Sequence, residues 1–541
     1  MATDRFAQSP ASTAAASTAP SGTTLRRPPR ATEVEQYSVD TIAHEDRTSR
    51  PIDLFRIQFG GANTFATVIL GTLPVLLFGL SFAEAVLAIL VGVALGALVL
   101  CPMGLFGPRT GTNNAVSSGA HFGTAGRVIG SFLSLLTAVA FFSISVWVSG
   151  DAVVGALGRL AGVADSQPLR AAVYAIIGVL VMVVVVYGYQ FMLLVNKVVV
   201  VGNSVLFLLG IAAYASVFDP GYTSSTGYLL GSFWPTFVLS VLVVMGNPVS
   251  FGAFLGDWSR YIPASTPKRR LIGATLLAQA ATLVPFMFGV ATATLVAGES
   301  DYVVALVQAS PLWFTFPLIV VAFLGGMSTG ITSLYGTGLD FSSVFPRFSR
   351  VQASLLIGSI AFVFILVGRL LTDLFASVNA FIGLIIVCTT PWMVIMIIGF
   401  AVRRGFYLPR DLQVFNRGEV GGAYRFSGGV NWRPVIAWVV GAASGLLFVY
   451  YPPLLVGPLS AAVAGGIDVS LPVSIGVAAV LYLGSLFLFP EPHYVFGPRG
   501  PWLVPSRDFD DELPPIRTKD GSAVHRAGGV DPAAAAAAPV R

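Results

Sequence analysis

Long apolar segments alternate with short polar ones over most of the chain. Twelve of these segments come close to the roughly 20 residues that a helix needs to cross a hydrocarbon layer of about 30 Å. Their approximate limits are 57–81, 84–103, 127–157, 171–190, 195–217, 232–256, 271–298, 312–340, 353–372, 375–401, 434–453 and 471–489. Barrel strands would show short alternating patterns instead. The pattern therefore predicts an all-α polytopic membrane protein with twelve transmembrane helices, since a helix pairs its backbone groups within its own segment.

The composition agrees with a chain that lies in lipid. Only 11% of the 541 residues are charged and 55% are hydrophobic, whereas a soluble domain carries roughly 25% charged residues. Residues 1–52 and the stretch from about Pro498 onward are rich in small and polar residues. We expect both stretches to be disordered tails, because they offer too little apolar surface to fold.

The basic residues are distributed unevenly across the predicted membrane. If both termini lie on one side, 28 of the 31 Lys and Arg residues fall on that side, and only Arg159, Arg170 and Arg369 fall on the other. Basic residues gather in cytoplasmic loops. The asymmetry therefore predicts that both termini are cytoplasmic and that the protein is a multi-pass protein of the plasma (inner) membrane. It also accounts for the net charge of +5 without a nucleic-acid partner.

Residue types that carry out chemistry are scarce. Cys101 and Cys388 both lie in apolar segments, and the four histidines lie outside the predicted spans. This distribution argues against a disulfide framework, a zinc site and an intramembrane histidine relay. No nucleophile, metal-ligand set or pair of acids stands at one depth. The sequence predicts a protein that is not an enzyme, with no cofactor and no metal beyond a possible Na+ site.

Two apolar spans are interrupted by residues that break helices. The first contains Gln58–Thr67 (QFGGANTFAT) with Asn63, and the sixth contains Met245–Gly252 (MGNPVSFG) with Asn247 beside Pro248. Transporters built from inverted repeats place interrupted helices at matching positions of their two halves. The two interruptions are five spans apart, an odd offset, so the second half would be inverted relative to the first. Gly and Pro are also frequent in ordinary membrane helices, so the interruptions alone leave both interpretations open.

Two further spans carry polar groups. The segment Gly325–Gly338 holds five Ser or Thr residues and five glycines. Such a segment serves either close helix packing or a cation site made of hydroxyl and carbonyl oxygens. In the third span, Phe141 and Ser145 lie one helical turn apart, with Trp147 close by. An aromatic ring beside a hydrogen-bonding group can hold a planar heterocycle, with stacking worth roughly 1–3 kcal/mol, although such residues more often face lipid or the core.

Several motifs together carry a family resemblance. They are Phe59–Asn63 (FGGAN), Gly188–Gln190 (GYQ), Asn196–Lys197, Gly256–Pro263 (GDWSRYIP), Tyr335–Asp340 (YGTGLD), Pro391–Trp392, Arg403–Tyr407 (RRGFY) and Gly428–Trp432 (GGVNW). From about Asp53 to Pro490 the chain resembles the nucleobase:cation symporters of the purine and cytosine permease type. The resemblance implies the leucine-transporter-type fold, a five-plus-five inverted repeat followed by two C-terminal helices. The repeats would cover 53–217 and 218–402, followed by a cytoplasmic loop at 403–433, helices eleven and twelve at 434–490 and a cytoplasmic tail at 491–541.

The resemblance also implies a site midway through the membrane, between the interrupted helices and helices three, eight and ten. The substrate-binding candidates are Phe141, Ser145, Trp147, Asn63, Asn247, Tyr335 and Asn379, and the cation-binding candidates are Ala66, Gly325, Ser328 and Thr329. Phe141 stands where relatives commonly have Trp, and Ser145 stands where they have a longer amide side chain.

These features predict a secondary active transporter that imports a nucleobase (a purine or cytosine) or a related small heterocycle by cation symport with alternating access. An allantoin- or hydantoin-like ring or a vitamin heterocycle is the alternative substrate, and a channel or facilitator without cation coupling is the alternative mechanism. The acidic residues near the spans lie at span ends, so Na+ and H+ both stay open as coupling ion. We expect a monomer or weak homo-oligomer whose partners are the heterocycle and the bilayer.

Overall fold

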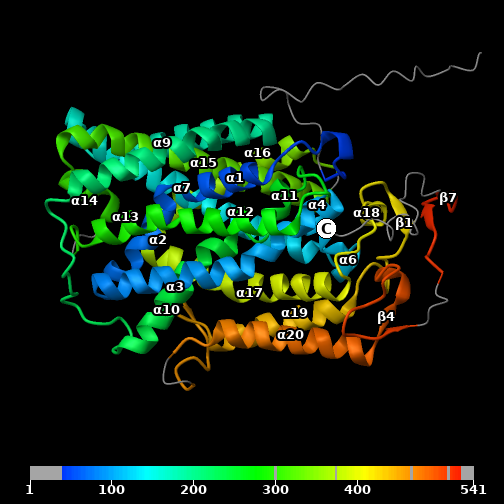
Figure 1. The fold of residues 1–541 in the computed structure, drawn as a ribbon. Helices are drawn as coiled ribbons and strands as arrows, with labels where there is room; N and C mark the ends of the chain where they lie inside the picture. The colour runs from blue at the N-terminus through cyan, green and yellow to red at the C-terminus, as the bar shows by residue number, and fades with distance from the viewer. Residues whose placement is uncertain are drawn as a thin grey trace, which may run out of the picture.

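The structure, a computed structural model, describes residues 39–297, 301–345, 347–371, 374–463, 467–507 and 512–524, without the side chains of 367–371, 374–377 and 379. Most of its long helices run along one common direction (Figure 1). The helices are α1 (Pro51–Ala62), α2 (Phe65–Leu76), α3 (Phe82–Leu100), α4 (Phe106–Thr110), α5 (Asn114–Ser117), α6 (Gly119–Phe122), α7 (Val128–Ala161), α8 (Gln167–Tyr187), α9 (Tyr189–Tyr214), α10 (Phe233–Ser250), α11 (Leu255–Ser259), α12 (Lys268–Ala281), α13 (Leu283–Ala293), α14 (Tyr302–Ala309), α15 (Leu312–Val344), α16 (Arg350–Leu371), α17 (Leu374–Val402), α18 (Pro409–Leu412), α19 (Trp432–Phe448) and α20 (Ser470–Leu488).

The remaining elements are short. Three 3-10 turns are described, at His44–Asp46, Cys101–Leu105 and His493–Val495. The strands are β1 (Glu419–Gly421), β2 (Tyr450–Tyr451), β3 (Leu455–Val456), β4 (Glu491–Pro492), β5 (Ser506–Arg507), β6 (Ile516–Thr518) and β7 (Ala523–Val524). They pair as β1-β6-β7, β2-β3 and β4-β5. None is long enough to cross a membrane, so the helices form the membrane domain.

The long apolar helices coincide with the predicted spans. Within the described residues, nine helices are long and apolar enough to cross a membrane, and α1 and α2 form a tenth span as a bent pair. The helices α16 (Arg350–Leu371, 22 residues) and α19 (Trp432–Phe448, 17 residues) fall on the ninth and eleventh predicted segments. The total of twelve spans stays a prediction, because α19 is shorter than a full crossing.

The centre of the bundle contains the stretch of α10 and α11, which buries nearly its whole surface. In the apolar part of Phe233–Ser259, 94% of the residues are buried, against 22% in α20. The long helices α7 and α15 pack along each other, and Gly326 allows their close contact, because a Cβ there would lie 2.0 Å from Ser149 Oγ. Outer helices expose apolar side chains such as Leu208 and Val480, as expected of surfaces that face lipid.

One end of the bundle, which we call the basic end, contains the short helices α4, α6, α11 and α18 (Figure 1, right), and α5 packs against α4 and α6. Arg403 and Glu491 form a fully buried ion pair there, with Arg403 Nη2 2.8 Å from Glu491 Oε2. Asn431 Nδ2 donates to the other oxygen of the carboxylate at 2.6 Å. This pair fastens the end of α17 to the segment that follows α20, because neither buried charge has water as an alternative partner.

His121 of α6 joins the same cluster. Its Nδ1 lies 2.9 Å from the Arg403 guanidinium and its Nε2 lies 3.0 Å from the Tyr407 hydroxyl. Arginine only donates, so Nδ1 accepts and the ring proton sits on Nε2. Burial and the charge of Arg403 hold the pKa of His121 well below its usual value, which keeps the ring neutral.

Parts of both predicted tails are folded. Val39 and Ile42 are buried, and the backbone N–H of Ser49 donates to the Tyr261 carbonyl at 3.0 Å. After α20, β4 pairs with β5, and β6 pairs with β1 of the 403–433 loop. The expectation of disordered tails up to residue 52 and from about Pro498 is therefore too wide. These segments find backbone partners in distant loops, which local composition does not reveal.

Replacing Glu491 by Gln should destabilise the protein by about 3–5 kcal/mol, because it leaves the Arg403 charge buried without a counter-charge. The midpoint of thermal unfolding of the purified protein in detergent measures the effect. Glu419→Gln is the matched control, because it removes a carboxylate from the more exposed pair with Arg410, whose charged atoms lie 2.7 Å apart; it should cost about 1 kcal/mol or less. Equal losses in the two variants would contradict a structural role for the buried pair.

Candidate functional site

The first predicted interruption is a break in the helix. α1 ends at Ala62, α2 begins at Phe65, and the two axes are bent by 58°. The backbone N–H of Asn63 still donates to the Phe59 carbonyl at 2.7 Å, whereas Thr64 is extended (φ −146°, ψ 165°). A helix end leaves the carbonyl groups of its last turn without helical partners. In an apolar layer these groups must find partners within the protein.

Hydroxyl groups of α15 supply those partners. Ser328 Oγ donates to the Gly60 carbonyl at 2.9 Å, and Thr329 Oγ1 donates to the Gly61 carbonyl at 3.0 Å. Thr329 Oγ1 also lies 3.2 Å from Thr64 Oγ1. The carbonyl end of a helix carries partial negative charge, so this buried group of oxygens has the chemistry that a hard monovalent cation requires.

Two asparagines of α9 also form hydrogen bonds at the helix break. Asn196 Oδ1 lies 2.8 Å from Ser328 Oγ and shares the one hydroxyl proton of Ser328 with the Gly60 carbonyl, and Asn203 Nδ2 donates to the Asn63 carbonyl at 2.7 Å. Gly60 permits the approach, because a Cβ on it would lie 2.1 Å from Asn196 Oδ1 and 2.9 Å from Asn196 Cβ. Because Gly60 has no side chain, the helices α1, α9 and α15 can come into close contact at this residue.

The second interruption lies later in the chain than the sequence suggests. α10 continues through Pro248 to Ser250, and the turn covers Phe251–Phe254 before α11 begins. Proline removes one helical hydrogen bond, but here its ring packs against Gly96 of α3, where a Cβ would lie 2.2 Å from Pro248 Cγ. Packing against α3 thus supports the helix at Asn247–Pro248, and the break follows at Phe251.

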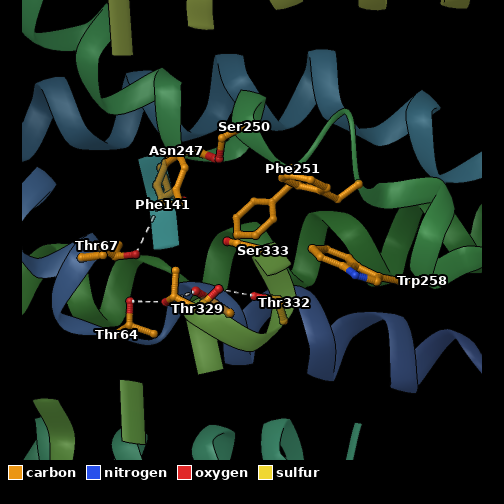
Figure 2. A pocket seen from close by; sticks show the side chains of 13 residues that line it. Thr64, Thr67, Phe141, Asn247, Ser250, Phe251, Trp258, Thr329, Thr332 and Ser333 are labelled. Atoms are coloured by element: carbon orange, nitrogen blue, oxygen red, sulfur yellow. Dashed lines mark hydrogen bonds between the residues drawn. The ribbon is translucent and has the colours of Figure 1, made fainter. Parts of the chain in front are cut away.

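Both breaks border one enclosed pocket between α2, α7, α10 and α15 (Figure 2). Its lining residues are Gly61, Thr64, Ala66, Thr67, Phe141, Asn247, Ser250, Phe251, Phe254, Trp258, Thr329, Thr332 and Ser333. The free volume is about 20 Å³, which is room for about one water molecule. Figure 2 shows the ring of Phe251 between Phe141 and Trp258. A heterocycle is larger than this space, so it fits only when side chains of the lining turn aside.

Asn247 presents a half-paired amide to this pocket. Its Nδ2 donates to Thr67 Oγ1 at 3.2 Å, while its buried Oδ1 has no partner among the described residues. The ring of Phe141 lies beside the amide (Figure 2). Buried polar atoms in proteins are almost always hydrogen-bonded. The free oxygen therefore marks a position where the N–H group of a bound molecule gains a hydrogen bond.

The structure places two predicted substrate-binding residues, Phe141 and Asn247, in the lining of the pocket, and it places Ser145 and Trp147 elsewhere. Ser145 Oγ donates at 2.9 Å to a carbonyl of its own helix, α7. Trp147 is buried but is not part of the lining. Serine hydroxyls in helices commonly turn back in this way, so their spacing along the helix does not reveal where they point.

Asn63 and Tyr335 also face other parts of the protein. Asn63 Nδ2 donates to Ser204 Oγ of α9 at 3.1 Å, and neither residue is part of the pocket lining. Tyr335 lies towards the basic end, where its hydroxyl accepts from Arg260 at 3.0 Å. Asn379 is part of α17, but its side chain lies outside the described part of the structure.

The predicted cation-binding residues lie close to one another. Besides the two hydroxyls of α15, Gly325 lies one turn earlier, where a Cβ would be 3.0 Å from Thr64 Cα. Ala66 belongs to the first turn of α2 and lines the pocket. The carbonyl groups of the first span that accept from α15 are those of Gly60 and Gly61.

Sequence reasoning did not single out several lining residues, namely Thr64, Thr67, Ser250, Phe251, Phe254, Trp258, Thr332 and Ser333. Most of them flank the two breaks directly. A search for hydroxyl and aromatic residues within a few positions of each helix interruption would therefore have found most of these residues.

Two broken helices with an enclosed pocket between them, and a set of oxygens beside that pocket, are the architecture of a secondary transporter. The family described as "Permease for cytosine/purines, uracil, thiamine, allantoin" matches residues 41–473, and the chain belongs to this family. It is 24% identical over 467 residues to the putative purine-cytosine permease YxlA of Bacillus subtilis (strain 168), covering 83% of this chain and 95% of the relative. It is 23% identical over 370 residues to the cytosine permease of Escherichia coli (strain K12), covering 64% of this chain and 84% of that one.

Solved structures show the same fold. One is Mhp1, a nucleobase-cation-symport-1 family transporter in a closed conformation with bromovinylhydantoin bound (TM-score 0.67, 19% identity, 84% of this chain and 95% of that chain). Another is a Na+-coupled sialic acid symporter in a substrate-bound outward-open state (TM-score 0.56, 14% identity, 84% and 93%). The predictions of an all-α membrane transporter fold and of a transporter in place of an enzyme are confirmed. The division into two five-helix repeats stays a prediction.

Replacing Gly60 by Ala should destabilise the protein by about 1–3 kcal/mol, because the new methyl group overlaps Asn196 and pushes α1 away from α9. The thermal unfolding midpoint measures this loss. Gly273→Ala on α12, where a Cβ meets no atom within 4 Å, is the control and should be neutral or slightly stabilising. If both variants behaved alike, the close contact at Gly60 would not be required.

Proposed function

We propose that the protein imports a small, neutral, planar nitrogen heterocycle, a purine or cytosine in the first place, together with a cation. The observation that carries the proposal is the half-paired amide of Asn247 beside the ring of Phe141 in the enclosed pocket. The ring of the substrate would stack on Phe141, and one of its N–H groups would donate to Asn247 Oδ1. A buried hydrogen bond of this kind contributes roughly 1–3 kcal/mol to selection among bases.

The lining favours a neutral substrate. Among the described residues that border the pocket, none is charged, and the polar side-chain groups are one amide, the indole N–H of Trp258 and several hydroxyls. A carboxylate or ammonium group buried there without a partner would cost far more than a neutral ring. This argues against amino acids and sugar acids and agrees with the cytosine and purine-cytosine permeases that the chain resembles.

A hydantoin-like ring is a second candidate substrate. It is also planar, neutral and rich in N–H and C=O groups, and Mhp1, which shares the fold, has bromovinylhydantoin bound. Asn247 and the hydroxyls of the pocket would serve either ring in the same way, so the choice depends on the space that opens when side chains of the lining turn aside.

The coupling ion would bind between the end of α1 and α15, and we propose Na+. The carbonyl groups of Gly60 and Gly61 and the hydroxyls of Ser328 and Thr329 supply oxygens at one buried place. Among the described residues that line the pocket there is no carboxylate that would carry a proton. One monovalent cation that enters at 100 mV contributes about 2.3 kcal/mol to accumulation.

The membrane setting follows from the charges. We propose that the basic end faces the cytoplasm of a plasma membrane, in line with the 28 of 31 basic residues assigned to that side. Alternating access would then open the pocket to either side while the site stays near the middle. A single copy would suffice, since one chain provides every residue that lines the pocket.

Purified full-length protein in liposomes should show saturable uptake of at least one labelled heterocycle when an inward Na+ gradient is imposed. The test panel is cytosine, adenine, uracil, hydantoin and allantoin. Asn247→Ala should lower the apparent affinity about tenfold to a hundredfold, because it removes a buried hydrogen-bond partner.

Asn416→Ala is the matched control for this experiment. Asn416 donates a hydrogen bond to Asp40 at 2.8 Å and lies far along the chain from every residue of the pocket, so uptake should be unchanged. Absence of saturable, gradient-dependent uptake of every heterocycle would overturn the proposed function. Unchanged affinity in Asn247→Ala would overturn the assigned role of this amide.

A further inference from the structure

A second cavity opens at the basic end, outside the substrate pocket. Its volume is about 470 Å³, and it is lined by Lys268, Phe400, Ala401, Arg404 and Trp502. These residues come from the beginning of α12, the end of α17 and the turn that follows it, and the segment after β4. The backbone N–H of Trp502 donates to the Val402 carbonyl at 2.8 Å, which fixes that segment against the end of α17.

Both charged residues that line this cavity in the described part of the chain, Lys268 and Arg404, are basic. Arg109 of α4 and Arg499 lie near enough to Lys268 for their charges to repel it. Among the described residues, no carboxylate lies within 4 Å of Arg109, Lys268, Arg404 or Arg499. Arg403, the neighbour of Arg404, is by contrast buried and paired with Glu491. Within the described part of the chain, these four cations therefore hold positive charge that no carboxylate at salt-bridge distance offsets.

The position and the apolar lining of the cavity suit the membrane surface. Lys268 is the first residue of a helix stretch that is long and apolar enough to cross a membrane, Lys268–Ala293. Ile272 and Leu276 follow one and two turns later on the same helix face, and Leu276 is 42% exposed. Trp502 is 48% exposed, and Lys268 Nζ lies 5.5 Å from the centre of the Phe400 ring. Aromatic and basic residues combine in this way where a helix leaves the hydrocarbon layer.

We propose that this cavity binds the phosphate headgroup of an anionic phospholipid from the leaflet at the basic end. Lys268 and Arg404 would contact the phosphate oxygens, and Arg109 and Arg499 would add attraction. The glycerol and first acyl carbons would lie against Phe400, Trp502 and the exposed apolar face of α12. A soluble anion would use the cations but gain nothing from this apolar face, which is why the lipid is the better occupant.

The proposal is independent of the transported substrate. Binding of phosphatidylglycerol to the purified full-length protein in a neutral detergent is measured by the rise of the thermal unfolding midpoint over a lipid titration, with phosphatidylcholine and inorganic phosphate as separate arms. The unfolding midpoint should rise with phosphatidylglycerol and should not rise with phosphatidylcholine or inorganic phosphate. A basic residue in contact with the headgroup contributes about fivefold to the affinity for anionic lipid, because about 1 kcal/mol of attraction is lost when it is removed. The double variant Lys268→Gln with Arg404→Gln should therefore bind phosphatidylglycerol roughly 30-fold more weakly.

The matched control is the double variant Arg269→Gln with Arg270→Gln. It removes the same charge from exposed residues adjacent to Lys268 that do not line the cavity, and it should keep most of the lipid response. An equal loss of affinity in both double variants would overturn the site, because it would reflect net charge alone. A response to phosphatidylcholine equal to that for phosphatidylglycerol would overturn the anionic headgroup, and an equal response to inorganic phosphate would show a free-anion site in place of a lipid site. A folding defect is separated from these outcomes by the midpoint of each variant without lipid.

Discussion

The hydrogen bonds between the broken first span and α15 are the constraint on which the rest of the structure depends. A helix that stops in the middle of an apolar layer exposes carbonyl groups, and no water is there to bind them. Ser328 and Thr329 satisfy the carbonyl groups of Gly60 and Gly61, and Asn203 satisfies that of Asn63. The break can exist only because α15 and α9 approach it closely, and this approach fixes the centre of the bundle.

The same break joins the two proposed binding sites. Thr64 and Thr329 line the enclosed pocket that is proposed to bind the heterocycle. Their hydroxyl oxygens, 3.2 Å apart, also belong to the group of oxygens between the end of α1 and α15 that is proposed to bind the cation. A cation that orders these oxygens would therefore also order one wall of the pocket. Because the neutral lining offers a substrate few strong contacts, affinity would depend on how well that wall is held in place. This is a physical basis for symport that needs no contact between the ion and the substrate.

More of the fold than of the binding site could be predicted from the sequence. Apolar segments of about 20 residues located the helices, and the Gly, Asn and Pro residues of the first and sixth spans pointed to the interruptions. The residues that line the pocket depended on details that local pattern does not contain. Ser145 turns back to its own helix, and Pro248 is accommodated because Gly96 of α3 leaves room for its ring. Phe251 and Trp258 enter the site because the turn after α10 directs them there. Side-chain rotamers and contacts between helices that are distant in the sequence determine which residues line the pocket.

The proposed coupling can be measured as thermodynamic linkage in the purified protein. The dissociation constant of a labelled heterocycle is determined over a range of Na+ concentrations, and that of Na+ is determined with and without the heterocycle, for the wild type and for Ser328→Ala. Ser328 contacts the Gly60 carbonyl but does not line the pocket. The structure predicts that each ligand tightens the other by the same factor, about tenfold or more, and that this factor falls towards one in Ser328→Ala. A heterocycle affinity that is independent of Na+, or a coupling factor that survives the substitution, would contradict it.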